Sequence, residues 1–507
     1  MVRIVDDVST EMPDLEHAIR LTGYGIFHYE ILAVCALSVL CLGFQNGLSS
    51  YVFPAAQCEL DLTSFEIGIL NVAFLVGGVT SCFLWGGLAD NVGRKRVLVV
   101  SHLANAVVTI FCAVLPGTLT LIAGRCLNGF FAGAPGSIIF SYAAEFQPTK
   151  YQSVVVCCCG IVFTISWLLL PFLAYVILPL PIQLTTTTVF VLLPWRLFLL
   201  TLGFPELMTG LWFLRMPESP RFYMAKKMPK ECLEVLRLMY SRNKDKRPED
   251  YPVNRLHTHS VEDETKMAQQ IASLVKAPLL KLSCLSCAIM FANMFGTFGL
   301  GLWLPEFFVR FRQFELHHPD RPASILELSS HVDKNVTCQP TFDASVTVST
   351  VVIAVSAIIY NAVAGAIATK VSAKVIPLVS MVVGGVSSAT IYFLTSSVQN
   401  LVVASVFQAS MLTANMTIGN MVIEQFPTKV TGMAMCAIMF FGRTGAIVSN
   451  FLFGYFIDDR CEIPICVVAV LVLSGALLCW AVPTKKASGN KVTHEMDTRT
   501  GTQCVPS

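Results

Sequence analysis

Glu145-Phe146-Gln147-Pro148-Thr149-Lys150 ends a long apolar stretch, and Glu424-Gln425-Phe426-Pro427-Thr428-Lys429 ends another. Both copies have the pattern E-x-x-P-T-K, and their offset is 279 residues (424 − 145 = 279). The same offset brings a second segment into register, because Gly86 meets Gly365 and Lys95 meets Lys374. Two segments that agree on one register indicate an internal duplication, which is typical of membrane proteins built from two related halves.

The composition is that of a chain solvated by lipid. Of its 507 residues, 54% are hydrophobic and only 13% are charged, whereas a soluble globular chain has about 25% charged residues. The formal net charge is +2, which gives no indication of nucleic-acid binding. Most of the 18 cysteines lie in apolar runs, where we expect them to be small buried hydrophobic residues.

Apolar stretches of about 20 residues predict twelve membrane-spanning helices. Their predicted ranges are 29–54, 66–89, 97–115, 118–144, 153–178, 195–214, 283–308, 345–369, 375–396, 399–423, 431–457 and 463–482. The fold class is therefore an all-α membrane protein whose helices form two pseudo-symmetric bundles of six. The predicted domains are an N-terminus at 1–28, a first bundle at 29–214, a linker at 215–282, a second bundle at 283–482 and a tail at 483–507.

The charges predict which side each loop faces. Arg94, Lys95 and Arg96 follow the second helix, and the linker at 215–282 holds many Lys and Arg residues. Since positive residues stay in the cytosol, both termini and the linker are predicted to be cytosolic. No cleavable signal peptide is visible at the start of the chain.

Two features fall on the opposite, lumenal or extracellular side. Asn335-Val336-Thr337 matches the N-glycosylation acceptor pattern and lies in the predicted outer loop at 309–344. Cys58, Cys338 and Cys461 lie in outer loops as well, where an oxidising compartment would allow disulfides. The sequence does not say whether they pair.

The segment that begins at Gly86 predicts a latch at the cytosolic helix ends. Gly86 would let another helix approach closely, Gly93 would permit a tight turn, and Asp90 would accept backbone or cationic partners. Arg94 could then reach Glu145 at the end of the fourth helix. We expect this pair to hold helix ends together in one state and to break in another; the alternative is a plain positive-inside loop.

The second copy of the latch is degraded. Thr369, Ser372 and Ala373 stand where the first copy has Asp, Gly and Arg. Glu424 remains, with Lys374 as its only evident basic partner in the motif, so we expect a weaker latch in this half.

Several motifs together resemble the major facilitator superfamily, and within it the synaptic vesicle glycoprotein 2 family, near the organic ion and sugar transporters. The resemblance covers about residues 25–483 and is carried by residues 85–96, by Ile-Ile-Phe-Ser-Tyr-Ala-Ala-Glu-Phe at 138–146, by Met-Pro-Glu-Ser-Pro-Arg-Phe at 216–222 and by Gly-Leu-Gly-Leu-Trp-Leu-Pro at 299–305. The loop at 309–344 lacks the large repeat-rich domain of that family, so the chain is similar to the compact invertebrate relatives. Gln45 occupies the position of a family glutamate, so a proton-binding carboxylate is missing there.

The resemblance implies a solute site near the bilayer midplane between the two halves. The candidate residues for substrate or coupling are polar or aromatic residues of the spanning helices: Gln45, Asn46, Arg125, Trp167, Glu206, Phe298, Trp303, Asn415, Asn420 and Arg443. Each aromatic residue could instead pack against lipid or the core. Arg125 could face a cavity or a partner, or it could lie near the interface and extend toward water.

Glu206 follows Pro205 near the middle of the sixth predicted helix. A carboxylate at that depth could bind a proton, or it could meet Arg196, Arg125 or an organic cation. The sixth helix is usually peripheral in this fold, so a neutral, structural Glu206 is the alternative.

The leading interpretation is a secondary transporter of a small polar organic solute, either an organic ion or a sugar-like molecule, that works by alternating access. The alternative is a transport-inactive vesicle membrane protein with a trafficking or regulatory role. We expect no enzyme activity, cofactor or metal, because no phosphate loop, nucleophile motif or metal-spaced cluster is present. The expected partners are the solute, the lipid bilayer and a coupling ion, in a monomer of an intracellular vesicle or the plasma membrane.

Overall fold

The computed structural model describes residues 14–115, 117–181, 184–185, 191–256, 267–317, 344–368 and 370–483. Within them the regular structure is helical, apart from one antiparallel pair of short strands, β1 (Leu184–Thr185) and β2 (Val191–Leu192). Asn335, Cys338 and Thr369 lie outside the described residues, as does the side chain of Cys58. Glycosylation and disulfide pairing therefore stay predictions.

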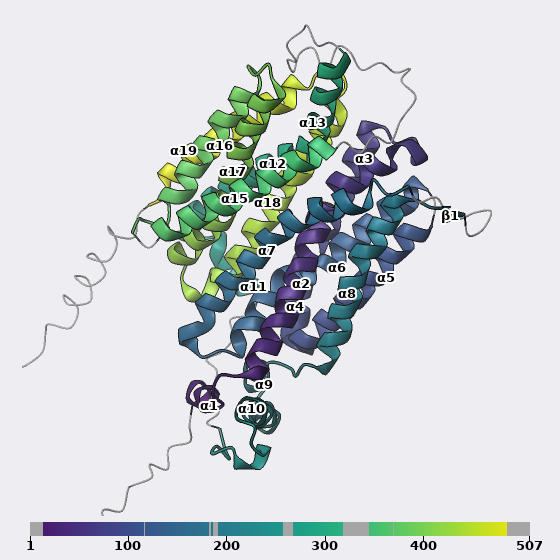
Figure 1. The fold of residues 1–507 in the computed structure, drawn as a ribbon. Coiled ribbons are helices and arrows are strands. Elements are labelled where there is room, and N and C mark those ends of the chain that lie inside the picture. Colours follow the sequence, from purple (N-terminus) through teal and green to yellow (C-terminus); the bar gives the residue numbers. More distant parts are fainter. Residues whose placement is uncertain are drawn as a thin grey trace, which may run out of the picture. The chain divides into compact units, whose positions relative to one another are not determined.

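Among the described residues, ten helical segments are long and apolar enough to cross a bilayer (Figure 1). They are Ile26–Gly47 (α2), Ser64–Val92 (α4), Arg94–Val114 (α5), Thr149–Ile177 (α7), Pro194–Arg215 (α8), Leu279–Leu316 (α12 and most of α13), Val348–Ala368 (in α15), Ser397–Gln425 (α17), Val430–Phe456 (in α18) and Glu462–Ala481 (α19). Two further helices complete the twelve predicted spans. One is α6 (Thr118–Glu145), which carries Arg125 in its interior, and the other is the shorter apolar helix α16 (Val375–Ile391).

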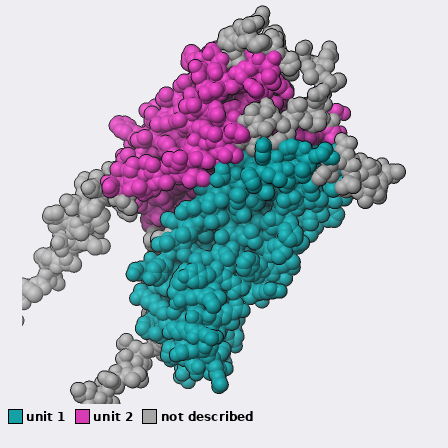
Figure 2. All heavy atoms as spheres, in the orientation of Figure 1, with its two compact units in different colours: residues 1–48, 77–264 teal, residues 49–76, 265–507 magenta. Residues whose placement is uncertain are grey.

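The chain divides into two compact units, which Figure 2 shows in different colours. Unit 1 comprises residues 1–48 and 77–264, and unit 2 comprises residues 49–76 and 265–507. Helix α4 contributes its first part to unit 2 and its second part to unit 1. Residues 49–76, which were predicted to lie in the first bundle, thus belong by their contacts to unit 2.

Unit 1 is built around α2, which packs against α6, α7 and α8, while α5 packs against α6 and α8. Its core includes the fully buried side chains of Tyr142, Phe146 and Phe213. The short helices at one end of the unit are α1 (Leu15–Leu21), α9 (Pro220–Ala225), α10 (Pro229–Lys244) and the 3-10 turn η1 (Pro248–Asp250). Helix α10 is amphipathic, and its apolar face joins the same core through Cys232 and Leu236.

Unit 2 is built around α12 (Leu279–Phe298), which packs against α17, α18 (Thr428–Phe456) and α19. Helix α16 packs against α17 and α19, and α15 (Ala344–Ala368) packs against α17. The remaining helices are α3 (Ser49–Leu60), which packs against α13 (Leu300–His317), and α11 (Met267–Leu274), which packs against α12 and α18.

Two predicted helices are interrupted. The first, expected to run over 29–54, ends at Gly47, and the chain continues as the separate helix α3. The seventh breaks at Gly299, between α12 and α13, inside a glycine-rich stretch. A Cβ at Gly299 would overlap the Ser449 side chain and the Phe295 carbonyl, so the close packing at the break requires glycine.

The helix boundaries repeat at the offset found in the sequence. Helix α6 begins at Thr118 and α17 at Ser397, 279 residues later (397 − 118 = 279). Helices α7 and α18 both contain 29 residues, begin at Thr149 and Thr428, and follow the proline N-caps Pro148 and Pro427. The duplication inferred from two short motifs therefore extends to whole helices.

Candidate functional site

Charged residues from three helices meet at one end of unit 1. Nη2 of Arg94, in the first turn of α5, lies 3.0 Å from Oε1 of Glu145 and 3.6 Å from Oδ1 of Asp90. The side chains of Arg94 and Glu145 are only 19% and 11% exposed, whereas that of Asp90 is 72% exposed. The contact between Arg94 and Glu145 that the sequence predicts is present. Because the pair is largely buried, removal of one partner would leave a charge without compensation.

Two residues of the motif at 216–222, which were not among the predicted site residues, complete this cluster. Both carboxylate oxygens of Glu218 accept a hydrogen bond from the backbone N–H of Lys95, at 3.0 and 3.1 Å, where the first N–H groups of α5 lack helical partners. The hydroxyl of Ser219, the N-cap of α9, donates to Glu145. A serine followed by a proline at the first helical position is a helix-start signal, so the start of α9 could be predicted from the sequence.

Gly93 is the N-cap of α5 and has a positive φ of 114°. A Cβ at this position would overlap the carboxylate of Glu218, so glycine serves both the turn and the close approach of that side chain. The close helix approach expected at Gly86 is not seen among the described residues, where a Cβ at Gly86 would meet no atom within 4 Å.

The structure corrects the predicted pairing of Lys374 with Glu424. Nζ of Lys374 donates to the carbonyl oxygens of Val482, at 3.0 Å, and Trp480, at 3.5 Å. These carbonyls lie at the C-terminal end of α19, where the last carbonyl groups lack helical partners and the helix dipole attracts a cation. Lys374 therefore joins the start of α16 to the end of α19, and the side chain of Glu424 is exposed on α17.

A continuous network of buried polar side chains lies inside unit 1. The guanidinium of Arg125 (2% exposed) donates to Oε1 and to the backbone carbonyl of Gln45, both at 3.1 Å. Gln45 donates through Nε2 to the hydroxyl of Thr109, at 3.2 Å, and Asn128 donates to the same hydroxyl at 3.0 Å. Of the two alternatives for Arg125, the structure shows the buried one with a side-chain partner.

Glu206 (2% exposed) belongs to the same network. Its Oε1 accepts from Nδ2 of Asn105 at 2.8 Å, and its Oε2 lies 2.5 Å from Nδ1 of His102. From the sequence, a proton, Arg196, Arg125 or an organic cation was expected at Glu206, and neither His102 nor Asn105 was among these. Arg196 instead donates to the backbone carbonyls of Ala113 and Val114, because it lies ten residues before Glu206, near the start of α8.

The sequence did contain a signal for these partners. His102, Asn105 and Thr109 are polar residues spaced three and four positions apart in the otherwise apolar stretch 102–114, which puts them on one face of α5. Arg125 and Asn128 have the same three-residue spacing in α6. Helical spacing of polar residues inside apolar helices thus predicts the network, although it does not predict which residues bond.

Two other candidates of unit 1 lie outside this network. Nδ2 of Asn46 donates to the carbonyl of Leu42 in its own helix, at 2.7 Å. The indole N–H of Trp167, on α7, is buried and has no hydrogen-bond partner among the described residues. A buried donor without a partner is costly, and a bound polar solute would satisfy it.

The candidates of unit 2 fall into two groups. Phe298 and Trp303 are buried at the helix break, and Nε1 of Trp303 donates to Oδ1 of Asn450 at 3.3 Å, so Trp303 has a structural partner. The others lie apart on longer helices: Asn415 (half-buried) and Asn420 (exposed) on α17, and Arg443 (half-buried) on α18.

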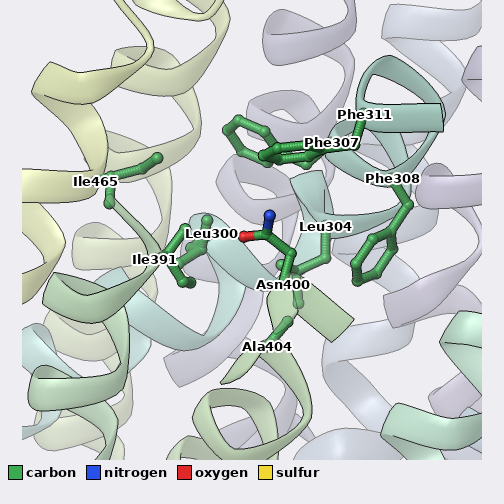
Figure 3. A pocket seen from close by; sticks show the side chains of 9 residues that line it. All are labelled: Leu300, Leu304, Phe307, Phe308, Phe311, Ile391, Asn400, Ala404 and Ile465. Carbon is green, nitrogen blue, oxygen red and sulfur yellow. The ribbon is translucent and has the colours of Figure 1, made fainter. Parts of the chain in front are cut away.

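Figure 3 shows a hollow inside unit 2, in which the carboxamide of Asn400 lies among apolar side chains such as Phe307, Phe311 and Ile465. The cavity volume is about 10 Å³, which is the space of about one water molecule. Ligand pockets are usually at least about 300 Å³, so this hollow does not hold a solute in the present conformation.

The profile described as Major Facilitator Superfamily matches residues 35–450 of this chain, which is most of its length. The chain belongs to the Major Facilitator Superfamily. It is therefore a multi-pass membrane protein of a transporter superfamily, as its sequence predicts.

Among curated proteins, this major facilitator chain is similar to synaptic vesicle glycoprotein 2A of Rattus norvegicus. The two are 27% identical over 320 residues, which cover 57% of this chain and 43% of the relative. Synaptic vesicle glycoprotein 2B of Homo sapiens is 24% identical over 311 residues, which cover 56% and 46%. The alignments thus span less than half the length of these relatives.

Among solved structures, this major facilitator chain is similar to a D-xylose-proton symporter, with a TM-score of 0.65 and 14% identity over 90% of this chain and 99% of that one. An inward-open xylose transporter XylE from E. coli gives a TM-score of 0.65 and 15% identity, over 90% and 97%. At this level of identity the likeness shows the fold alone.

Proposed function

We propose that this major facilitator chain is a secondary transporter that carries a small polar organic solute, either an organic ion or a sugar-like molecule, by alternating access. The observation that carries the proposal is the buried network of unit 1, where Arg125 and Gln45 meet between apolar helices. Buried charge is costly in a bilayer and usually marks the path of a solute or ion. The superfamily and the symporter-like fold support the same reading.

The cluster of Arg94, Glu145 and Ser219 supports the alternating-access part of the proposal. It joins the ends of α5, α6 and α9 through one ion pair and one hydroxyl bond. Such a cluster can hold these helix ends in one arrangement and release them in another. We propose that it acts as the gate of unit 1, with Asp90 as an exposed auxiliary partner of Arg94.

A transport-inactive vesicle membrane protein with a trafficking or regulatory role is the second candidate. Two observations favour it. Gln45 stands where a titratable acid is expected from the resemblance, and Lys374 is bound to backbone carbonyls and so is not free to act as a gate in unit 2. The relatives named as synaptic vesicle glycoproteins fit this alternative as well.

We further propose that the protein acts as a monomer in an intracellular vesicle or the plasma membrane, with both termini in the cytosol and without enzyme activity. Asn335 provides the test of sidedness. Digestion of the expressed protein with a glycosidase should increase its gel mobility, and the Asn335→Gln variant should migrate like the digested protein. Attachment of glycan at a site engineered near Asp90 would contradict the proposed orientation.

Transport is tested in proteoliposomes with a panel of organic cations, anions and sugars, in uptake and in exchange. The variant Gln45→Leu removes the amide that binds Arg125, and Asn46→Leu, next to it, removes an amide that is bonded only within its own helix. We expect Gln45→Leu to lower uptake about tenfold or more, because the buried guanidinium loses a partner, and Asn46→Leu to change it less than about twofold. Uptake and exchange equal to empty vesicles for every solute would favour the second candidate.

A further inference from the structure

His102 and Glu206 form a buried pair in which both ring nitrogens and both carboxylate oxygens have a polar partner. Nδ1 of His102 lies 2.5 Å from Oε2 of Glu206, and Asn105 donates to the other carboxylate oxygen at 2.8 Å. On the far side of the ring, Nε2 of His102 lies 2.7 Å from the hydroxyl of Ser38 on α2. Phe213 stacks on the imidazole with ring centroids 5.8 Å apart, so an apolar ring covers one face of it.

This arrangement is compatible with two protonation states of the imidazole. A neutral His102 that donates from Nδ1 to Glu206 can accept at Nε2 from the hydroxyl of Ser38. A protonated His102 donates from both nitrogens, and the same hydroxyl then accepts, because a serine hydroxyl is both donor and acceptor. One proton can therefore enter or leave while every hydrogen bond of the pair is retained.

Hydrogen bonds connect this pair to Arg125. Asn105, which donates to Glu206, accepts through Oδ1 from Asn128 at 2.7 Å. Asn128 and Gln45 both donate to the hydroxyl of Thr109, at 3.0 and 3.2 Å. Gln45 in turn accepts from Arg125 at 3.1 Å. A buried anion and a buried cation are thus the ends of one chain of amide and hydroxyl groups.

The other titratable and charged groups around the pair come from the helices packed against it. From α2, the thiol of Cys41 is near Glu206 and contacts Thr209. From α5, Cys112 is near Arg125 on α6. Arg196, near the start of α8, donates to the backbone carbonyl of Ala113. On α7, Cys159 is near Cys35 of α2. Among the contacts described for unit 1, His102 has Glu206 as its direct charged neighbour.

We propose that His102, held by Glu206, is the proton-binding group that couples a proton to the solute in this transporter. The proposal rests on the proposed transport function, and it assigns coupling to α5 and α8, away from the α2 position occupied by Gln45. A solute that contacts Gln45 or Arg125 would change the charge and hydrogen bonding along the chain that ends at Glu206. By linkage, the solute and the proton then change each other's affinity by the same factor.

The first experiment measures proton binding without transport. The full-length protein in detergent is titrated with pH while histidine vibrations are followed by infrared difference spectroscopy on protein labelled in its histidines. We expect one component of the titrating histidine signal to be lost in His102→Gln and retained in His28→Gln. His28, on α2, is the matched control, because it too is buried but bonds to the Phe146 carbonyl and to Asn243, and no carboxylate among the described residues contacts it. A titration identical in wild type and His102→Gln would overturn the proposal.

The second experiment measures coupling. In proteoliposomes with an imposed pH gradient, coupling to one proton allows an accumulation of up to about tenfold per pH unit. We expect the wild type and His28→Gln to accumulate solute toward this limit, and His102→Gln to reach a ratio of about one while solute exchange stays measurable. Accumulation by His102→Gln equal to that of the wild type would contradict the assignment.

A third variant tests the proposal even if His102→Gln does not fold. Ser38→Ala keeps the imidazole and the carboxylate and removes the oxygen that accepts from the protonated ring. We expect its accumulation ratio to fall at least about threefold, since a buried N–H would then lack a partner; an unchanged ratio would count against the proposal. If the wild type neither takes up nor exchanges any solute, the transport function fails, and the histidine titration still decides whether the proton site exists.

Discussion

Nη2 of Arg94 lies 3.0 Å from Oε1 of Glu145, and the second carboxylate oxygen of Glu145 accepts from the hydroxyl of Ser219. One carboxylate thereby joins the start of α5, the end of α6 and the start of α9. Because Glu145 is the last residue of α6, its position depends on where that helix ends. The helix boundary and the charge contact are therefore parts of one structural feature.

Replacement of this carboxylate should destabilise unit 1. In Glu145→Gln, Arg94 keeps its charge and loses its buried anionic partner, so we expect the free energy of unfolding to fall by about 2–3 kcal/mol. Arg96→Gln, which removes an exposed charge two residues away, should change it by less than about 0.5 kcal/mol. Thermal unfolding in detergent measures both, and equal shifts for the two variants would contradict the interpretation.

Gly93 and Gly86 form a second matched pair. Gly93→Ala places a Cβ at a φ of 114° and against the Glu218 carboxylate, and we expect a loss of about 1–3 kcal/mol. Gly86→Ala meets no atom within 4 Å and should be neutral or slightly stabilising, because alanine favours the helix. A greater loss of thermal stability in Gly86→Ala than in Gly93→Ala would show that another helix contacts Gly86 in the detergent-solubilised protein.

The two candidate tryptophans should respond differently to loss of the indole N–H. Trp167→Phe removes a donor without a partner among the described residues, so if a solute accepts from it, the apparent KM should rise about fivefold with little change in stability. Trp303→Phe removes the bond to Asn450 and should lower the unfolding free energy by about 1 kcal/mol. Uptake kinetics and thermal unfolding of both variants provide the test; an unchanged KM in Trp167→Phe would exclude the indole as a solute ligand.

Glu16 provides a pH-dependent contact between α1 and the start of α7. Partial burial raises the pKa of its carboxyl, but hydrogen bonds from Thr149 and Arg20 outweigh this effect and hold the pKa below its ordinary value of 4.5. A lowered pKa in the folded state means that the stabilisation is present above pH 4.5 and is lost as the pH falls through the lowered pKa. We expect Glu16→Gln to cost about 0.5–1 kcal/mol at neutral pH.

Measurement at low pH is the control for the Glu16→Gln variant. The difference in thermal stability between wild type and Glu16→Gln should shrink as the pH falls below 4.5, because the wild-type carboxyl becomes protonated. A difference that stays constant into the acid range would show that the loss in the variant does not come from the charge.

Cys232 should report opening of the short helices of unit 1. Burial against the core raises the pKa of its thiol to about 12, so the fraction of reactive thiolate at neutral pH is negligible. We expect maleimide to leave Cys232 unmodified in the folded protein, and to modify it at a rate that rises when Leu236→Ala loosens α10. Mass spectrometry of the peptide that contains Cys232 measures the rate, and rapid labelling of the folded wild type would contradict the described packing.

The spanning helices could be predicted from the sequence because burial in lipid requires long apolar segments, whatever they pack against. The repeat offset was equally accessible, since Pro148 and Pro427 mark the same helix start in both halves. The pairing of Arg94 with Glu145 followed from two charged residues that the topology brings to the same helix ends. Local composition and spacing decided all of these features.

Only the tertiary structure decided which buried polar groups bond to each other. The partners of Glu206 are His102 and Asn105 on another helix, more than 100 residues away, and neither was among the partners considered from the sequence. Lys374 binds the end of α19 and not Glu424, and residues 49–76 group with the second unit. Rotation and packing of neighbouring helices set these contacts, and those depend on the fit of many side chains at once, which no local pattern in the chain encodes.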